Sequence, residues 1–164
     1  MTQREKQILE ILENDSRTGA EQIAIMLGMD VAEVRAKIAE WEAQKIIIKY
    51  NTIVNWEKLG DDTVTAMIEV KIAPQRDAGY DSLAERIYRY PEVKSVLLMS
   101  GGYDLAVLIE GQSLKEVAMF VSEKLATIDG VQSTGTHFVL KKYKMGGVIL
   151  NGKHEDDKRL VITP

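Results

Sequence analysis

KSVLLMSGGYDLAVLIEG, residues 94–111, has a glycine turn between two runs of apolar residues. The runs cover positions 96–99 and 105–109, and successive strand residues point to opposite faces. Both faces of the resulting hairpin are therefore apolar, and both need a cover. Within the turn, Ser100-Gly101-Gly102 permits positive φ and exposes backbone N–H groups, while Tyr103 and Asp104 add a phenol and a carboxylate. The turn is a candidate ligand site, although a plain glycine turn beside a packed tyrosine explains the same residues.

The segments around this hairpin give the order β-α-β-β-α-β. Alternation predicts a strand over residues 63–72, and helical spacing predicts a helix over 80–88 that Pro91 stops. A second helix is expected over 114–128, beginning at a Ser113–Glu116 capping pair, and a last strand over 131–143. This order is typical of an α+β, ferredoxin-like βαββαβ domain, in which both helices lie on one face of a four-stranded antiparallel sheet.

The face of that sheet away from the helices is expected to meet a second subunit. On the predicted last strand, one apolar face holds Thr134, Thr136, Phe138 and Leu140. We place this face outside, together with half of the hairpin, and predict a dimer that pairs further. Beyond it, Met145-Gly146-Gly147 leads into Val148–Leu150, a polar loop and residues 159–162, which form either a hairpin across a neighbour or a frayed tail.

Residues 1–60 indicate three helices and an extended linker. Capping pairs precede each helix: Thr2 with Glu5, Thr18 with Glu21, and Asp30 with Glu33. Gly28 stands where a helix C-terminus favours a left-handed residue. Two short helices joined by a glycine turn are typical of a helix-turn-helix, here of the winged type, but a three-helix bundle without a DNA role has the same pattern. We expect a DNA-binding domain with linker over 1–60, a ligand-binding and oligomerisation domain over 61–144, and a strand or tail over 145–164.

The third helix is the candidate reader of double-stranded DNA. Arg35 and Lys37 are the expected base or phosphate contacts, beside the small residues Ala32 and Ala36. Lys45 and Lys49 follow the helix as expected backbone contacts. Residues 1–60 hold eight Lys and Arg against ten Asp and Glu, a net charge of −2 that is unusual for a DNA-binding domain. Four of these carboxylates are explained by helix capping.

Composition excludes several other classes of protein. The 164 residues, 45% hydrophobic and 28% charged, suit one domain or two small ones. There is no cysteine and there are only two histidines, so disulfides and metal centres of cysteine or histidine are excluded, and we expect no metal and no cofactor. No apolar run approaches the roughly 20 residues of a membrane span. We therefore expect a cytoplasmic protein without a membrane partner.

With these parts in this order, the chain resembles the leucine-responsive and asparagine-responsive (Lrp/AsnC) family of prokaryotic transcription regulators over nearly its whole length. The residues that carry the resemblance are Ile8-Leu9-x-Ile11-Leu12, Leu27-Gly28-Met29, the pattern Val34-x-x-Lys37-Ile38-x-x-Trp41-Glu42 with Lys45-Ile46-Ile47 after it, residues 55–60, and Gly102-Tyr103-Asp104. The resemblance implies dimers formed through the C-terminal sheets, further assembly into tetramers or octamers, and amino-acid binding near the glycine turn. Three positions depart from the family pattern, which usually has Ser for Asp30, Arg for Lys37 and Leu for Trp41; these differences concern DNA affinity and operator choice.

An amino-acid effector would bring an ammonium and a carboxylate to the predicted site, which comprises Ser100–Asp104 with three further residues. Asp104 and turn carbonyls can accept from the ammonium, and glycine N–H groups with the hydroxyls of Thr134 and Thr136 can donate to the carboxylate. Met99 would favour an aliphatic or thioether side chain. Asp104 has an alternative role in capping its own turn.

The function predicted from these features is sequence-specific DNA binding and transcriptional regulation, modulated by a small molecule, and not an enzyme. One alternative is an effector-binding assembly protein with weakened DNA binding, suggested by the net acidic N-terminal part. Another is a haem-pathway decarboxylase of the same architecture, which would use basic and histidine side chains. His137 is the one histidine within the predicted ferredoxin-like domain, in a strand where a structural role is expected.

Overall fold

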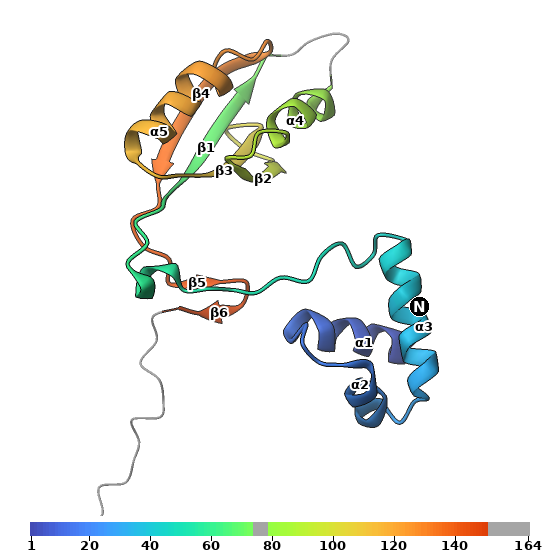
Figure 1. Ribbon diagram of the computed structural model, residues 1–164. Coiled ribbons are helices and arrows are strands. Elements are labelled where there is room, and N and C mark those ends of the chain that lie inside the picture. Colours follow the sequence, from blue (N-terminus) through green and yellow to red (C-terminus); the bar gives the residue numbers. More distant parts are fainter. Residues whose placement is uncertain (74–78, 151–164) are drawn as a thin grey trace, which may run out of the picture. The chain divides into compact units, whose positions relative to one another are not determined.

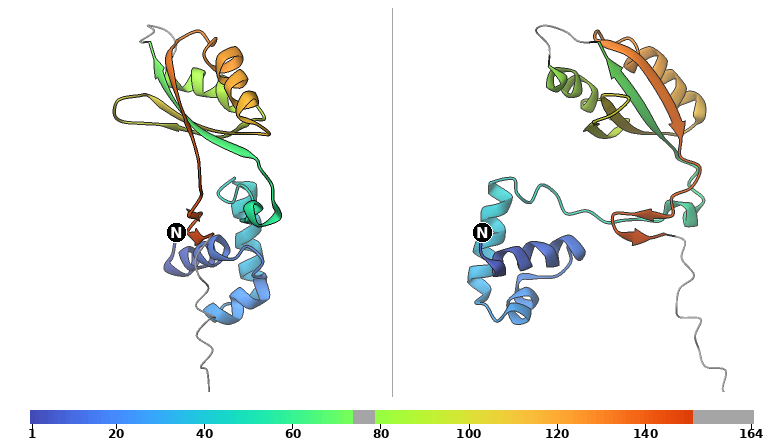
Figure 2. Two further views of the ribbon diagram at one scale, coloured as in Figure 1. Left: turned by 90° about the vertical axis from the view of Figure 1, so that its left-hand side faces the viewer. Right: turned by 180° about the vertical axis from the view of Figure 1, so that it is seen from behind.

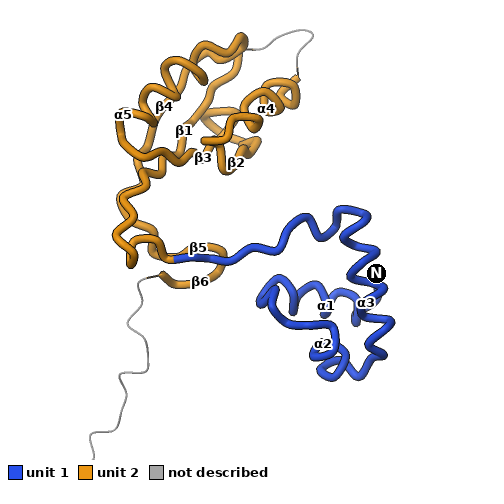
Figure 3. Tube along the Cα trace, in the orientation of Figure 1, with its two compact units in different colours: residues 1–54 blue, residues 55–164 orange. Residues whose placement is uncertain are grey.

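The computed structural model describes residues 1–73 and 79–150 and divides the chain into two compact units (Figure 3). Unit 1 is Met1–Val54 and unit 2 is Asn55–Pro164. The division lies before the boundary predicted at residue 60, within the part of the chain expected to hold the extended linker. Each unit has its own hydrophobic core.

Unit 1 consists of three helices: α1 (Gln3–Asn14), α2 (Ala20–Leu27) and α3 (Val31–Ala43) (Figure 1). Its core comprises Ile8, Leu12, Ile23, Ala24, Val34 and Trp41. The predicted helix-turn-helix geometry is present, because Gly28 takes a left-handed conformation (φ 60°) between α2 and α3. Residues 1–54, all of them described, contain no strand, so this unit lacks the wing that was predicted.

The helix starts follow the predicted caps in two of three cases. Thr2 and Glu5 form a reciprocal capping box, and the Asp30 carboxylate accepts from the N–H groups of Ala32 and Glu33. The predicted Thr18–Glu21 pair is wrong, because Gly19 is the N-cap of α2 and its helix end has no side-chain cap. The Glu21 carboxylate is therefore available for another partner.

Unit 2 contains a four-stranded antiparallel sheet with the order β2-β3-β1-β4, which confirms the ferredoxin-like prediction. Its strands are β1 (Val64–Ile72), β2 (Val93–Leu98), β3 (Leu105–Gly111) and β4 (Val131–Phe138). The helices α4 (Tyr80–Tyr88) and α5 (Leu114–Met119) lie on one face of this sheet (Figure 2). A short 3-10 helix, η1 (Trp56–Leu59), precedes β1.

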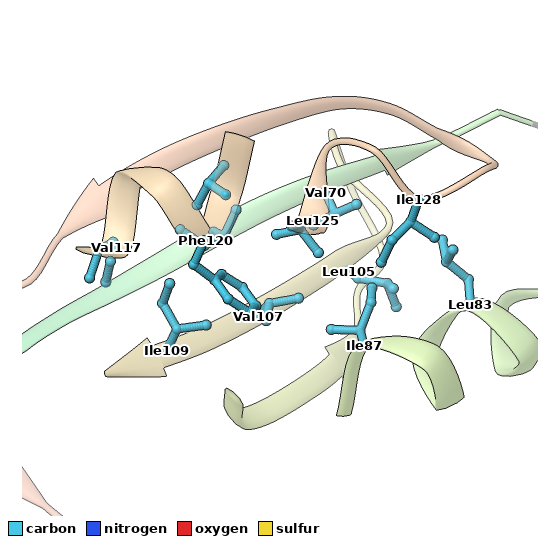
Figure 4. Packing of buried hydrophobic residues seen from close by; sticks show 13 residues of the cluster. Val70, Leu83, Ile87, Leu105, Val107, Ile109, Val117, Phe120, Leu125 and Ile128 are labelled. Atoms are coloured by element: carbon cyan, nitrogen blue, oxygen red, sulfur yellow. The ribbon is translucent and has the colours of Figure 1, made fainter. Parts of the chain in front are cut away.

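The core of unit 2 lies between the helices and the sheet, where Leu83 and Ile87 of α4 approach the strands (Figure 4). The predicted second helix is not uniform: after Met119 it continues as a π-helical segment, η2 (Phe120–Leu125). There the Ala126 N–H donates to the Val121 carbonyl, an i to i−5 bond of 2.8 Å. Phe120, Val121 and Leu125 of this segment are all buried.

The prediction for the outer face of the sheet is wrong in part. In the register of β1 and β4, Val70 pairs with Thr134, Ile68 with Thr136 and Ala66 with Phe138. Paired residues share a face, so these three β4 side chains lie on the helix-covered side, and Leu140 lies beyond β4. The open face instead carries Met67, Glu69, Leu97, Ala106, Leu108 and His137 by register. It is mixed in character, with His137 Nε2 3.3 Å from Glu69 Oε1.

The end of the last strand also differs from the prediction. β4 stops at Phe138 and not at residue 143. The Val139 N–H still donates to the Thr65 carbonyl (2.9 Å), but β1 begins at Val64, so later residues have no β1 partner. A small hairpin follows, formed by β5 (Lys144–Met145) and β6 (Val148–Ile149). Gly146 and Gly147 both have positive φ, 52° and 82°, as a two-residue type I′ turn requires. The predicted polar loop and residues 159–162 lie outside the described residues.

Candidate functional site

The surface of α3 that faces away from the core of unit 1 carries three of the predicted DNA-binding residues. Ala32, Arg35 and Ala36 are exposed, whereas Val34 and Trp41 on the opposite side are buried. The Asp30 cap fixes the start of the helix, with its carboxylate 2.8 Å from the Ala32 N–H. The exposed surface of α3 therefore carries the small side chains of Ala32 and Ala36 beside the long cationic side chain of Arg35.

Arg35 forms an ion pair with Glu21 of α2, a residue that the sequence analysis treated as a cap. Both side chains stay largely exposed, so the pair lies on the outer surface of the helix-turn-helix. The backbone N–H of Glu21 itself, followed by Arg35, lowers the pKa of the Glu21 carboxyl below its usual range. The carboxylate is therefore ionised throughout the neutral range.

Lys37 lies on the flank of α3 that faces α1. Its ammonium is 3.0 Å from Glu5 and 3.1 Å from Glu40. The Thr2 backbone N–H, followed by Lys37, lowers the pKa of the Glu5 carboxyl to about 2, and the same contact raises the pKa of Lys37. This residue thus connects α3 to α1 and is only partly accessible.

Lys45 occupies the left-handed position just after α3, with φ 60°. The N–H of Lys45 donates to the Glu42 carbonyl (3.2 Å) and that of Ile46 to the Trp41 carbonyl (2.9 Å), the two bonds of a Schellman motif. Glycine usually fills this position. Lys49 follows in a segment without regular structure, where it is exposed.

The charge of unit 1 remains acidic in the structure. Residues 1–54 hold seven Lys and Arg against nine Asp and Glu. Three of these cations form ion pairs, and within residues 1–54 those without one are Arg4, Arg17, Lys45 and Lys49. Few cations are thus available to DNA phosphates.

In unit 2, the predicted ligand turn closes the β2–β3 hairpin. The Met99 N–H donates to the Asp104 carbonyl at 2.8 Å. Ser100, Gly101 and Gly102 are exposed, and Gly101 has φ 149°, while Tyr103 is half-buried. The polar backbone of this turn is therefore accessible.

Asp104 connects the turn to the rest of the domain. Its backbone N–H donates to the Val70 carbonyl (3.0 Å), and its Oδ2 accepts from the Ile72 N–H at 2.7 Å. The Tyr80 hydroxyl, at the start of α4, lies 3.5 Å from Oδ1. β3 begins only at Leu105, so the Asp104 side chain takes the place of a strand carbonyl for the last residue of β1. This is a structural role, across the sheet and not within the turn itself.

Thr134 and Thr136 lie on β4, and β1 separates them from the strand that carries the turn. Thr134 shares a row with Val70 and Leu105. Two strand spacings place it about 10 Å from Leu105. Within one chain, the structure therefore brings Asp104 together with Tyr80 and Ile72, and it keeps the two threonines apart from the turn.

Several partners of the predicted site residues were missed from sequence: Glu21 for Arg35, Glu5 and Glu40 for Lys37, and Tyr80 for Asp104. The weak signal for Glu21 was its position two residues after Gly19, a glycine that could itself be the N-cap of α2. Sequence held no signal for Tyr80, because its contact with Asp104 joins distant parts of the chain. Among the described residues, no group of three or more His, Asp or Glu side chains is placed to hold a metal ion. No helix in residues 1–73 and 79–150 is long and apolar enough to cross a bilayer.

Residues 65–149 match the model of the Lrp/AsnC ligand binding domain. Over the full chain, the sequence is 52% identical to the uncharacterized HTH-type transcriptional regulator YugG of Bacillus subtilis, covering 99% of that protein. It is 32% identical to the HTH-type transcriptional regulator LrpA of Pyrococcus horikoshii, covering 87% of this chain and 98% of that one.

Solved structures have the same fold. AsnC of E. coli superposes with a TM-score of 0.69 at 23% identity, covering 88% of this chain and 95% of that one. The L-Met complex of the transcriptional regulator NMB0573 from Neisseria meningitidis superposes with a TM-score of 0.72 at 22% identity, covering 88% and 93%. The chain belongs to the Lrp/AsnC family of HTH-type transcriptional regulators, and it is a regulator with a ligand-binding domain, not an enzyme.

Proposed function

We propose that α3 binds in the major groove of double-stranded DNA, with Arg35 as the base contact and Lys45 and Lys49 on the phosphate backbone. The observation that carries the proposal is the exposed row of Ala32, Arg35 and Ala36 on the second helix of a helix-turn-helix. Lys37 contributes indirectly, because its ammonium is held between two carboxylates. The protein acts in the cytoplasm, on the DNA of its own cell.

Selection of genomic fragments bound by the protein, followed by footprinting, tests this reading. A helix-turn-helix dimer should protect two-fold related half-sites about 10 base pairs, or a multiple of that, apart. Arg35→Ala should weaken or relax the footprint while leaving assembly unchanged. An unaltered footprint in a folded Arg35→Ala protein would show that α3 is not the helix that recognises the DNA sequence.

A homodimer that pairs further into a tetramer or octamer is the proposed assembly. The open face of the sheet supports it, since it carries Met67, Ala106 and Leu108 beside Leu97, whose exposed fraction is 56%. Leu97→Lys should lower the molar mass measured by light scattering. Leu114→Lys, on a helix covering the other face and equally exposed (58%), is the matched control and should leave the mass unchanged. A wild-type monomer at micromolar concentration would contradict the proposal.

The proposed effector is an amino acid bound between subunits at the turn 99–104. Glycine N–H groups of one subunit and the hydroxyls of Thr134 and Thr136 of another would share its carboxylate, because within one chain β1 separates the threonines from the hairpin and Thr134 lies about 10 Å from Leu105. The exposed Met99 favours an aliphatic or thioether side chain, and the same fold has been solved with L-methionine in the Neisseria protein. Binding would shift the population of assemblies without a contact to DNA.

Calorimetry across the common amino acids, beginning with methionine, tests the effector. Thr134→Val and Thr136→Val should each weaken binding while retaining the fold, because both side chains lie on an edge strand. No heat from any amino acid would exclude the site.

The alternative function, an effector-binding assembly protein with weakened DNA binding, is favoured by one observation: two of the predicted DNA contacts, Arg35 and Lys37, are ion-paired within an acidic unit. Retention of amino acids without retention of any genomic fragment would establish it.

A further inference from the structure

We propose that Glu21 is a specificity-determining residue, which orients Arg35 toward base edges and keeps it from binding phosphates indiscriminately. The inference rests on the proposed DNA-binding role of α3. It adds a residue of α2 that makes the DNA surface selective.

The Glu21 carboxylate lies between the N-terminus of its own helix and Arg35 of α3. One oxygen, Oε2, lies 3.4 Å from the position that a Cβ would take at Gly19, so it lies over the side-chain-free N-cap of its own helix. The other oxygen, Oε1, accepts from Nη2 of Arg35, 14 residues further along the chain. The pair thus joins the two helices of the helix-turn-helix on their exposed side.

The hydrogen bond occupies Nη2 and leaves the other nitrogens of the guanidinium to other acceptors. A guanidinium can bind both the two acceptors of guanine and the oxygens of a phosphate in a bidentate manner, but the phosphate is negatively charged and the guanine edge is neutral. The Glu21 carboxylate competes with phosphate for the Arg35 guanidinium and repels phosphate, whereas its hydrogen bond to Nη2 restricts the orientations that the guanidinium takes. Non-specific binding therefore loses more affinity than specific binding.

Glu33 provides a matched control. It lies in the first turn of α3, is exposed, and makes no ion pair within residues 1–54, all of which are described. Glu33→Gln removes the same charge from the same unit without changing the partner of Arg35. Glu21→Asp gives the complementary control, because it retains the charge but withdraws the carboxylate by one methylene.

The experiment measures affinity for a selected operator duplex and for a scrambled duplex of equal length, at one fixed salt concentration. Glu21→Gln should bind the scrambled duplex about two- to fivefold more tightly, the factor that corresponds to an exposed ion pair. The ratio of operator to scrambled affinity should fall by a similar factor. Glu21→Asp should also lower the ratio, and Glu33→Gln should leave it unchanged.

Arg35→Ala separates this mechanism from a general effect of charge. In that background, Glu21→Gln should no longer change the ratio. An unchanged or higher ratio in Glu21→Gln and Glu21→Asp, with melting temperatures equal to wild type, overturns the role of Glu21. A wild-type protein that prefers no fragment overturns the proposed function itself, and with it the role of Glu21, so the two failures are distinguishable.

Discussion

The Lys37 ammonium of α3 lies 3.0 Å from the Glu5 carboxylate of α1, so a cation expected on DNA instead holds two helices of unit 1 together. Glu5 also accepts from the Thr2 N–H at 2.6 Å, which completes the capping box of α1. One carboxylate thereby serves both the start of one helix and the position of another. Its protonation should affect unit 1 as a whole.

Acid should destabilise unit 1 through Glu5. Its pKa is lowered from 4.5 to about 2, so the stabilisation is present above pH 4.5 and is lost as the pH falls toward 2. Glu5→Gln should reduce this dependence in that window. Fluorescence of the buried Trp41 measures it, in a Trp56→Phe background that removes the exposed tryptophan. The same acid dependence in wild type and variant would contradict the assignment.

Lys49 and Lys37 should differ in their effect on the salt dependence of DNA binding. A phosphate contact contributes a slope of about −0.9 in log affinity against log salt. Lys49→Gln should make the slope shallower, because Lys49 is a proposed phosphate contact, whereas Lys37→Gln should not, because the Lys37 ammonium is paired with Glu5 and Glu40. Affinity titrations between 50 and 200 mM salt, about the range in which such slopes are resolved, provide the measurement. Equal changes of the salt slope in the two variants would show that Lys37 also contacts a DNA phosphate.

Lys45→Gly should stabilise unit 1 by about 0.5 to 1 kcal/mol. A left-handed conformation costs a residue with a Cβ roughly 1–2 kcal/mol, and the greater freedom of glycine in the unfolded chain offsets part of the gain. Denaturant unfolding followed at Trp41 measures the change. If Lys45 also contacts a phosphate, the same variant binds DNA with a shallower salt slope, so stability and affinity move in opposite directions. A loss of stability would show that φ 60° at this position carries no strain.

Asp104→Ala should destabilise unit 2 by about 1–3 kcal/mol, since it leaves the partly buried Ile72 N–H without its acceptor. Asp104→Asn retains a side-chain oxygen and should cost less. Thermal unfolding of both variants gives the comparison, and it must precede any ligand titration, because reduced binding by Asp104→Ala would otherwise reflect an altered turn. Equal unfolding temperatures for wild type and both variants would show that the Ile72 bond contributes nothing.

Local sequence determined most of the secondary structure. Thr2, Asp30 and Ser113 start helices because a short polar side chain bonds backbone groups two or three residues away. Gly28 ends α2 because it takes φ 60° without a steric penalty. The strand and helix order also followed from periodicity, which depends only on neighbours in the chain. Family membership could accordingly be predicted from the same motifs.

Tertiary structure alone decided the features that depend on register and on distant partners. Alternation puts Thr134, Thr136 and Phe138 on one side of β4, but only pairing with β1 determines that this side faces the helices. The length of β1 likewise ends β4 at Phe138. Glu21 and Asp104 each serve a residue far away in sequence, Arg35 and Ile72, because a carboxylate binds whichever donor the fold brings within reach. Sequence shows such a side chain but not its donor, since donors at this separation meet only after the chain has folded.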